Sequence, residues 1–242
     1  MCITIVFRKL SKEFPLIIGN NRDELIKRKF SPPQILYSNP KIIGPKDLER
    51  GGTWLGINKN RILVNILNKW IGNKNFFGSD KYISRGQLVV ELLKLNSIED
   101  MLKKIKSINI NNYLPFHLLI ADENEAYVIL HNNNLEIHNI SDKNIFILGN
   151  INPFRQWEKY EYGYNFIKKK KINNYADIVS ILKELLSYHN GNKDIPSIDY
   201  AVDLGNFRTT SSSIVMINKK LIYKFHNGFP HKNSLYKDYI FE

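Results

Sequence analysis

The only cysteine of this 242-residue chain is Cys2, and its position is the most informative chemical feature of the sequence. Methionine is normally trimmed from a new chain when the next residue is small, so removal of Met1 exposes Cys2 as the first residue. A free N-terminal cysteine combines a nucleophile with a base. Its α-amine, with an ordinary pKa of about 7.7–8.0, can accept the proton of its own thiol, with an ordinary pKa of about 8.5. The alternative is that Cys2 is a small buried residue at the start of a strand.

A dense polar cluster, Asn21–Glu24, directly follows the apolar stretch Leu16–Gly19. If that stretch pairs with the first apolar stretch as a hairpin, the cluster lies beside Cys2. Arg22 would then lower the thiol pKa, and a carboxylate of the cluster would hold or orient the α-amine. The alternative is a solvated turn with a local ion pair of small energetic value. The sequence leaves both interpretations open.

The elements that would position these residues follow from apolar spacing. Short apolar, β-branched stretches between Asn, Asp and Gly turns predict strands in three blocks. Apolar residues at helical intervals predict helices in two blocks between them, one of them opened by the capping-box spacing of Ser84–Gln87. The predicted strands are 2–7, 14–19, 53–57, 61–67, 116–121, 126–131, 135–140, 145–148, 210–217 and 221–225. The predicted helices begin after Ser84, at Ser97, at Pro153 and at about 175, the last of them ending near 189.

The order strands, helices, strands, helices, strands contains no Pro/Gly/Ser-rich linker and no repeat. Antiparallel hairpins with two blocks of helices predict an α+β fold, with two stacked and mainly antiparallel sheets and the helices outside. One domain spanning 1–242 is the simplest account of this order.

The composition restricts the compartment and the class of protein. With 43% hydrophobic residues, the chain can bury a core without disulfides or a metal, and a single cysteine forms no internal disulfide. The first residues contain neither a basic stretch nor a long apolar run, and no window approaches the roughly 18 apolar residues that span a bilayer. We therefore expect a cytoplasmic protein without a transmembrane segment.

The net charge of +12 raises the question of nucleic-acid binding. The densest basic run, Lys168–Lys171, ends a helix-like stretch, where cations are favourable beside the last carbonyl groups. It contains no aromatic stacking platform and belongs to no nucleic-acid-binding module. We therefore expect a solvated basic face and no nucleic-acid partner.

Several motifs in order along the chain resemble those of the NRDE family, which is also called the transport and Golgi organisation protein two family. The resemblance covers residues 1 to about 225. Its motifs are Met1-Cys2-Ile3 with Asn21–Glu24, the run Gly51–Gly56, Ser84–Gly86 with Leu88-Val89, Gly149-Asn150 with Trp157, and Arg208 running into Thr209–Ser211. The resemblance implies an N-terminal-nucleophile αββα sandwich, and the layout is similar to that of penicillin V acylases and bile salt hydrolases.

Carried over residue by residue, the resemblance implies a set of site residues. Asp23 falls on the carboxylate that contacts the amine, Asn68 and Asn150 fall on oxyanion-hole groups, and Arg208 falls on a late arginine of the acylases. Such donors stabilise the tetrahedral oxyanion of amide or ester cleavage. The role of Arg22 relative to Glu24 stays open, because the acylases' first arginine precedes their asparagine.

Two positions depart from the family pattern. Asn20 stands where the family usually has a small residue, and 205–207 replace its Tyr-Gly-Thr. The resemblance implies a cysteine hydrolase that acts on a non-peptide C–N bond or a thioester of an acylated small molecule, with Cys2 as the nucleophile. This reaction requires no cofactor and no metal, and the substrate itself stays unknown.

The resemblance also suggests a rival function, because the family is associated with intracellular haem movement and lipid metabolism. A non-catalytic carrier would bind haem, or a lipid-like ligand, through a histidine, through the Cys2 thiolate or through an apolar cleft alone. The histidine positions show no haem-attachment motif and no paired-histidine helix. The histidines are His117, His131, His138, His189, His226 and His231.

Overall fold

The computed structural model describes residues 2–69, 81–190, 198–231 and 234–241. Met1, whose removal the sequence predicts, lies outside the described residues. Two compact units divide the chain. The first unit combines both ends, Met1–Arg28 and Lys143–Glu242, and the second is the continuous segment Lys29–Asp142. The units are therefore not two consecutive domains joined by a linker, and a single domain over the whole chain stays a prediction.

The described part of the first unit contains one antiparallel sheet in the order β10-β1-β2-β12-β13-β14, with β11 beside β12. The hairpin of β1 and β2 is central, because β10 pairs with β1 and β12 pairs with β2 along its whole length. The strands are β1 (Ile3–Arg8), β2 (Leu16–Leu25), β10 (Ile145–Leu148), β11 (Asp203–Leu204), β12 (Phe207–Ile217), β13 (Leu221–Asn227) and β14 (Lys237–Phe241).

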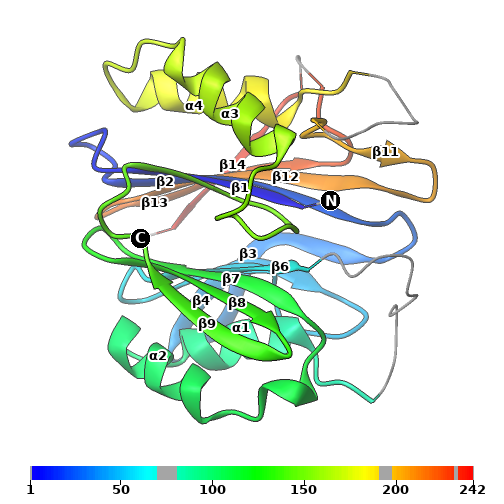
Figure 1. The fold of residues 1–242 in the computed structure, drawn as a ribbon. Coiled ribbons are helices and arrows are strands. Elements are labelled where there is room, and N and C mark those ends of the chain that lie inside the picture. Colours follow the sequence, from blue (N-terminus) through cyan, green and yellow to red (C-terminus); the bar gives the residue numbers. More distant parts are fainter. Residues whose placement is uncertain (1, 70–80, 191–197, 232–233, 242) are drawn as a thin grey trace. The chain divides into compact units, whose positions relative to one another are not determined.

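Helices α3 (Glu158–Lys168) and α4 (Tyr175–Leu186) cover one face of this sheet (Figure 1). Alternate residues of β1 point toward the helices, since side chains alternate between the faces of a strand. They form one apolar core with the inner face of α4. This helix begins with a complete capping box between Asn174 and Asp177, which satisfies the exposed N–H groups of its first turn.

The second unit contains a sheet in simple sequence order from β3 to β9. Helix α1 contacts β5 and β6, and α2 contacts α1. Trp54 lies in this core, and Gly51 and Gly52 have positive φ angles that suit a tight turn. The elements are β3 (Phe30–Ser38), β4 (Lys41–Asp47), β5 (Leu55–Asn58), β6 (Leu63–Asn68), α1 (Arg85–Leu93), α2 (Ile98–Ser107), a 3-10 turn (Ile110–Asn112), β7 (Phe116–Ala121), β8 (Ala126–Asn132) and β9 (Asn134–Asn139).

Three local predictions are wrong. The strand predicted to end at Gly19 continues as β2 to Leu25, so the cluster Asn21–Glu24 is a buried part of the strand and the alternative of a solvated turn is excluded. The helix predicted to begin at Pro153 begins at Glu158. Ser84 precedes α1 but accepts no capping hydrogen bond through its side chain. Among the described residues, no helix has the length and apolar character needed to cross a membrane.

Candidate active site

Cys2 lies at the start of β1, beside the backbone of β2. The strand register pairs Ile3 with Asn21, so one further step places Cys2 opposite Arg22. The Cys2 Sγ atom accepts a hydrogen bond from the Asp23 N–H at 3.2 Å and donates to the Asp23 carbonyl at 3.5 Å. The hairpin therefore brings the only cysteine and the polar cluster together, as the sequence predicts.

The thiol of Cys2 is held in its neutral form. Its pKa is raised from 9.0 to about 11, mainly by burial and then by the negative charge of Asp23, while the positive charge of the amino terminus opposes both. This is opposite to the lowered thiol pKa expected from the sequence. The reason is that a sulfur atom removed from water loses the solvation that stabilises a thiolate. The thiol must therefore lose its proton during its reaction rather than before it.

The side chain of Asp23 is fixed from the neighbouring strand. Its Oδ1 atom accepts a hydrogen bond of 2.6 Å from the Thr209 hydroxyl, and the same hydroxyl oxygen accepts from the Val202 N–H at 2.9 Å. Asp23 is buried and stands opposite Thr209 in the register of β2 and β12. The carboxylate is thus held rigidly beside the first residues of β1, where an amino-terminal amine would lie.

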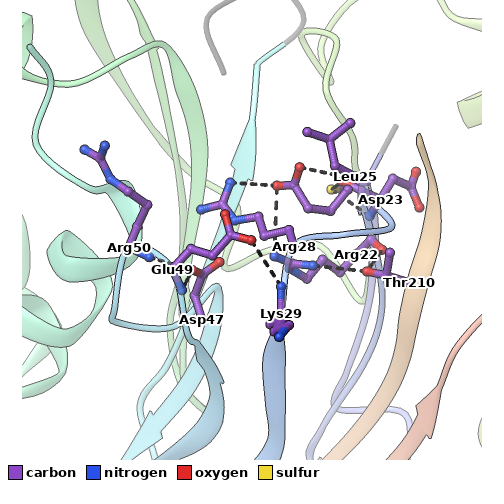
Figure 2. A network of polar contacts seen from close by, with 11 residues as sticks. Arg22, Asp23, Leu25, Arg28, Lys29, Asp47, Glu49, Arg50 and Thr210 are labelled. Carbon is purple, nitrogen blue, oxygen red and sulfur yellow. Dashed lines mark hydrogen bonds and ion pairs between the residues drawn. The ribbon is translucent and has the colours of Figure 1, made fainter. Parts of the chain in front are cut away.

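Arg22 and Glu24 form a different set of contacts (Figure 2). Arg22 donates to the Thr210 hydroxyl at 3.1 Å, and a second guanidinium nitrogen lies 4.0 Å from a Glu24 oxygen. Glu24 also accepts from Arg28 at 2.9 Å and from the Leu25 N–H. Because alternate side chains of a strand point to opposite faces, Arg22 and Glu24 do not share the face of Asp23. Glu24 mainly neutralises the two arginines.

Asn150 lies two residues beyond β10, on the other side of β1. The pairing of β1 with β10 ends at Thr4 and Leu148, and Asn150 lies in the segment that follows this end of the sheet. The Tyr160 hydroxyl secures this segment, because it accepts a hydrogen bond from the Gly149 N–H at 2.9 Å and donates to the Ile151 carbonyl at 2.6 Å. Asn150 is buried, and its two neighbours in the chain are held by this clamp.

The remaining two predicted site residues lie farther along the sheets. Arg208 is half-buried in β12, where its backbone stands opposite Glu24 of β2. Asn68 ends β6 of the second unit and pairs with Phe116 of β7. The structure therefore brings Cys2 to Asp23, and the roles of Asn150, Asn68 and Arg208 stay predictions.

Three residues of this region were not predicted. Thr209 and Tyr160 are the hydroxyl groups that hold Asp23 and the Asn150 segment. Lys159 is fully buried on α3, and burial lowers its pKa to about 8. A sequence signal for Lys159 existed, because it falls among the buried positions of its helix, where lysine is rare.

Metal and haem ligation gain no support from the geometry. In the described part of the chain, no three His, Cys, Asp or Glu side chains form a group that would hold a metal ion. His131 contacts the Tyr113 carbonyl, and both ring nitrogens of His226 lie within hydrogen-bonding distance of backbone carbonyls. Haem as a ligand stays a prediction.

The arrangement of the strands and helices is that of the N-terminal-nucleophile hydrolase fold, as three solved structures show. Penicillin V acylase from Agrobacterium tumefaciens superposes with a TM-score of 0.62 at 12% identity, covering 93% of this chain and 83% of the acylase. The N-acylethanolamine-hydrolyzing acid amidase orthologue of Caenorhabditis elegans gives 0.62 at 13% identity, covering 89% of this chain and 92% of the amidase. A variant of the conjugated bile acid hydrolase from Clostridium perfringens gives 0.55 at 12% identity, covering 98% and 92%. The predicted fold class is confirmed.

Within this fold class, the chain belongs to the Transport and Golgi organisation 2 family, because the family model matches residues 1–227. The predicted family is therefore confirmed over nearly the whole chain. The uncharacterized protein YGR127W of Saccharomyces cerevisiae is 33% identical over 106 residues, which cover 41% of this chain. The match spans about a third of the yeast protein's length, 33%.

Proposed function

We propose that this protein is a cysteine N-terminal-nucleophile hydrolase that cleaves a non-peptide C–N bond or a thioester of an acylated small molecule. One observation carries the proposal. The only thiol of the chain stands at the start of β1 with its sulfur hydrogen-bonded to the backbone of Asp23, in a fold shared with an acylase and an amidase.

The chemistry follows from the neutral thiol. After Met1 is removed, the Cys2 sulfur attacks the carbonyl carbon while its proton passes to the α-amine of the same residue. The tetrahedral intermediate collapses as the C–N or C–S bond breaks, and the ammonium returns its proton to the leaving amine or thiol. Water then attacks the acyl-enzyme thioester, with the amine again accepting a proton, and releases a carboxylic acid and the free thiol.

The neighbouring residues have distinct roles in this proposal. Asp23 orients the amine, since its carboxylate is fixed by Thr209 beside the start of β1. Asn150 donates to the oxyanion, and its burial in the segment that follows β10, the strand paired with β1, supports this role. Asn68 supplies the second oxyanion donor, by the resemblance to the acylases. Arg22 stabilises the strand end from the opposite face.

The test compares acyl-amide, acyl-ester and acyl-thioester substrates across four proteins. These are the trimmed wild type, a form with an uncleaved N-terminal tag, the same tag placed at the C-terminus, and Cys2→Ser. Blocking the amine removes the general base, so we expect turnover to fall about 10²–10⁴-fold in the N-terminally tagged form and not in its C-terminal control. Cys2→Ser should keep the fold and react far more slowly, because a hydroxyl is a weaker nucleophile.

A haem titration of the same four proteins tests the rival carrier function. Haem binding without turnover in the wild type, insensitive to the N-terminal tag, would replace the hydrolase proposal with a carrier. Loss of haem in Cys2→Ser would make the thiolate its axial ligand. Turnover that survives the N-terminal tag unchanged would refute the amine as the base.

A further inference from the structure

Lys159 is a buried cation at the first turn of α3. Its side chain is fully inaccessible to solvent. Its Nζ atom lies 5.4 Å from the ring centroid of Tyr200 and 5.5 Å from that of Trp157. Within the described part of the chain this ammonium has no hydrogen-bond partner. Burying an ammonium group without a hydrogen bond costs free energy, and contact with two aromatic rings offsets only part of that cost. This cost suggests that Lys159 has a role other than packing.

A short chain of hydrogen bonds connects Lys159 with the candidate active site. The Tyr200 hydroxyl donates to the Lys159 carbonyl at 2.9 Å, and the Tyr200 carbonyl accepts from the Asn21 side chain at 2.9 Å. Asn21 and Asp23 lie on the same face of β2, because they are two residues apart in a strand. Val202, two residues after Tyr200, donates to the hydroxyl that holds Asp23. Lys159 therefore belongs to the helix-facing side of the site.

Lys159 interacts with charged groups of the candidate active site and its surroundings. Burial lowers the pKa of Lys159, and the negative charges of Asp23 and Asp199 oppose that effect by favouring the protonated lysine. Asp199 is itself buried, with its second oxygen 2.8 Å from His189 Nδ1. Tyr160 and Tyr200 are the ionisable rings nearby, and burial keeps both neutral by raising their pKa values. Lys159 is thus a buried cation in the same cluster of ionisable groups as Asp23 and Cys2.

We propose that Lys159 is a positioning residue that keeps the α-amine of Cys2 in its neutral, basic form at neutral pH. This inference rests on the proposed function, in which that amine is the general base. Asp23 alone would stabilise the ammonium form of the amine, so that less of the neutral form that accepts a proton is present at pH 7. A second cation in the same buried cluster opposes that effect, because two like charges in a weakly polarisable surrounding destabilise each other. Asp23 thus favours the protonated form of the α-amine, and Lys159 favours its neutral form.

The direct test measures the amine and not the turnover. Competitive labelling with acetic anhydride between pH 6 and 10 gives the pKa of the α-amine, because only the neutral amine is acetylated. The background is the trimmed Cys2→Ser protein, in which no thiol competes for the reagent. Lys159→Met should raise the pKa of the amine by about one unit, a roughly tenfold smaller neutral fraction at pH 7. Lys168→Met, an exposed lysine of the same helix, is the matched control and should change nothing.

A second readout uses the wild-type nucleophile. In proteins with Cys2, the acid limb of the pH profile of kcat/KM should move to higher pH in Lys159→Met, with full activity returning at alkaline pH. Lys159→Arg should restore part of the shift, because it restores the charge. An unchanged amine pKa in folded Lys159→Met, or an amine that never reacts in the wild type, would overturn the inference. Absence of turnover in every wild-type assay would instead refute the proposed function, since the labelling result does not depend on it.

Discussion

Replacing Lys159 by methionine should make the protein more stable at neutral pH. Burial lowers the pKa of Lys159 from 10.5 to about 8. Protonation of the Lys159 side chain is therefore less favourable in the folded state than in the unfolded state. At about 1.4 kcal/mol for each pKa unit, a shift of roughly 2.5 units means that charging Lys159 costs the fold about 3 kcal/mol at pH 7. Methionine fills a similar volume without the charge and removes this cost.

The pH dependence of the effect has a definite sign. Because the pKa of Lys159 is lower in the folded state, its unfavourable contribution is fully present below about pH 8 and disappears as the pH rises toward 10.5. The wild type should therefore gain stability relative to Lys159→Met between pH 8 and 10.5. The difference between the two proteins should be largest at pH 7 and small at pH 10.5.

Urea unfolding of both proteins at pH 7, 8.5 and 10, followed by circular dichroism, measures this difference. Lys168→Met serves as the control for loss of a lysine from the exposed face of α3, and we expect its stability to change by less than about 0.5 kcal/mol. A folded Lys159→Met that is less stable than the wild type at pH 7, or a difference independent of pH, would refute the reasoning. Lys159 would then be a net stabilising member of the core.

Three further outcomes are expected. The intact mass of native protein should lack Met1, and a mass retaining it throughout would exclude an N-terminal nucleophile. Asp23→Asn should accelerate alkylation of Cys2 by iodoacetamide about threefold, because losing the carboxylate lowers the thiol pKa by roughly one unit and the lower nucleophilicity cancels part of the gain. The same variant should lower turnover, whereas an unchanged alkylation rate would remove Asp23 from the surroundings of the thiol. Tyr160→Phe should lower kcat more than it raises KM, because Asn150 loses its clamp, with a stability loss of about 1–3 kcal/mol measured by urea unfolding.

Local sequence patterns predicted the parts of the fold that are buried on one side or shaped by clear turns. The strand Phe116–Ala121 and the strand Ile145–Leu148 have the bounds that their apolar stretches predict. The pairing of the first hairpin was equally predictable, since both strands are apolar and a polar turn joins them. That pairing was sufficient to bring Cys2 to the polar cluster.

Four strands were not predicted, namely β3, β4, β11 and β14, and two of them contain residues that usually interrupt strands. β3 includes Pro32 and Pro33, and β4 includes Pro45. Proline removes a backbone donor, which an edge strand tolerates, and β3 is the edge strand of its sheet. The pairing of β3 with β4 shifts register between Ser31 and Gln34, which is where the two prolines lack a backbone N–H to donate. Composition alone cannot distinguish such an edge strand from a loop.

The alternatives for the polar cluster Asn21–Glu24 stayed open for a related physical reason. Four consecutive polar residues are typical of a solvated turn, yet here they are buried and have hydrogen-bond or ion-pair partners within the fold. Asn21 donates to two backbone carbonyls, Asp23 accepts from Thr209, and Glu24 neutralises Arg28. Those partners lie about 180 residues away for Asn21 and Asp23, so no local pattern contains them.

The energetics of this cluster favour a chemical role over a structural one. A fold gains little from burying Asp23 and Lys159 together, since the cost of removing two charges from water is commonly as large as their attraction. The thiol beside them is neutral, so the cluster does not stabilise a thiolate. A fixed carboxylate and a fixed ammonium do, however, determine the protonation state of a group placed between them. In the proposed reaction this group is the α-amine of Cys2 after removal of Met1, and its proton is the one that must move.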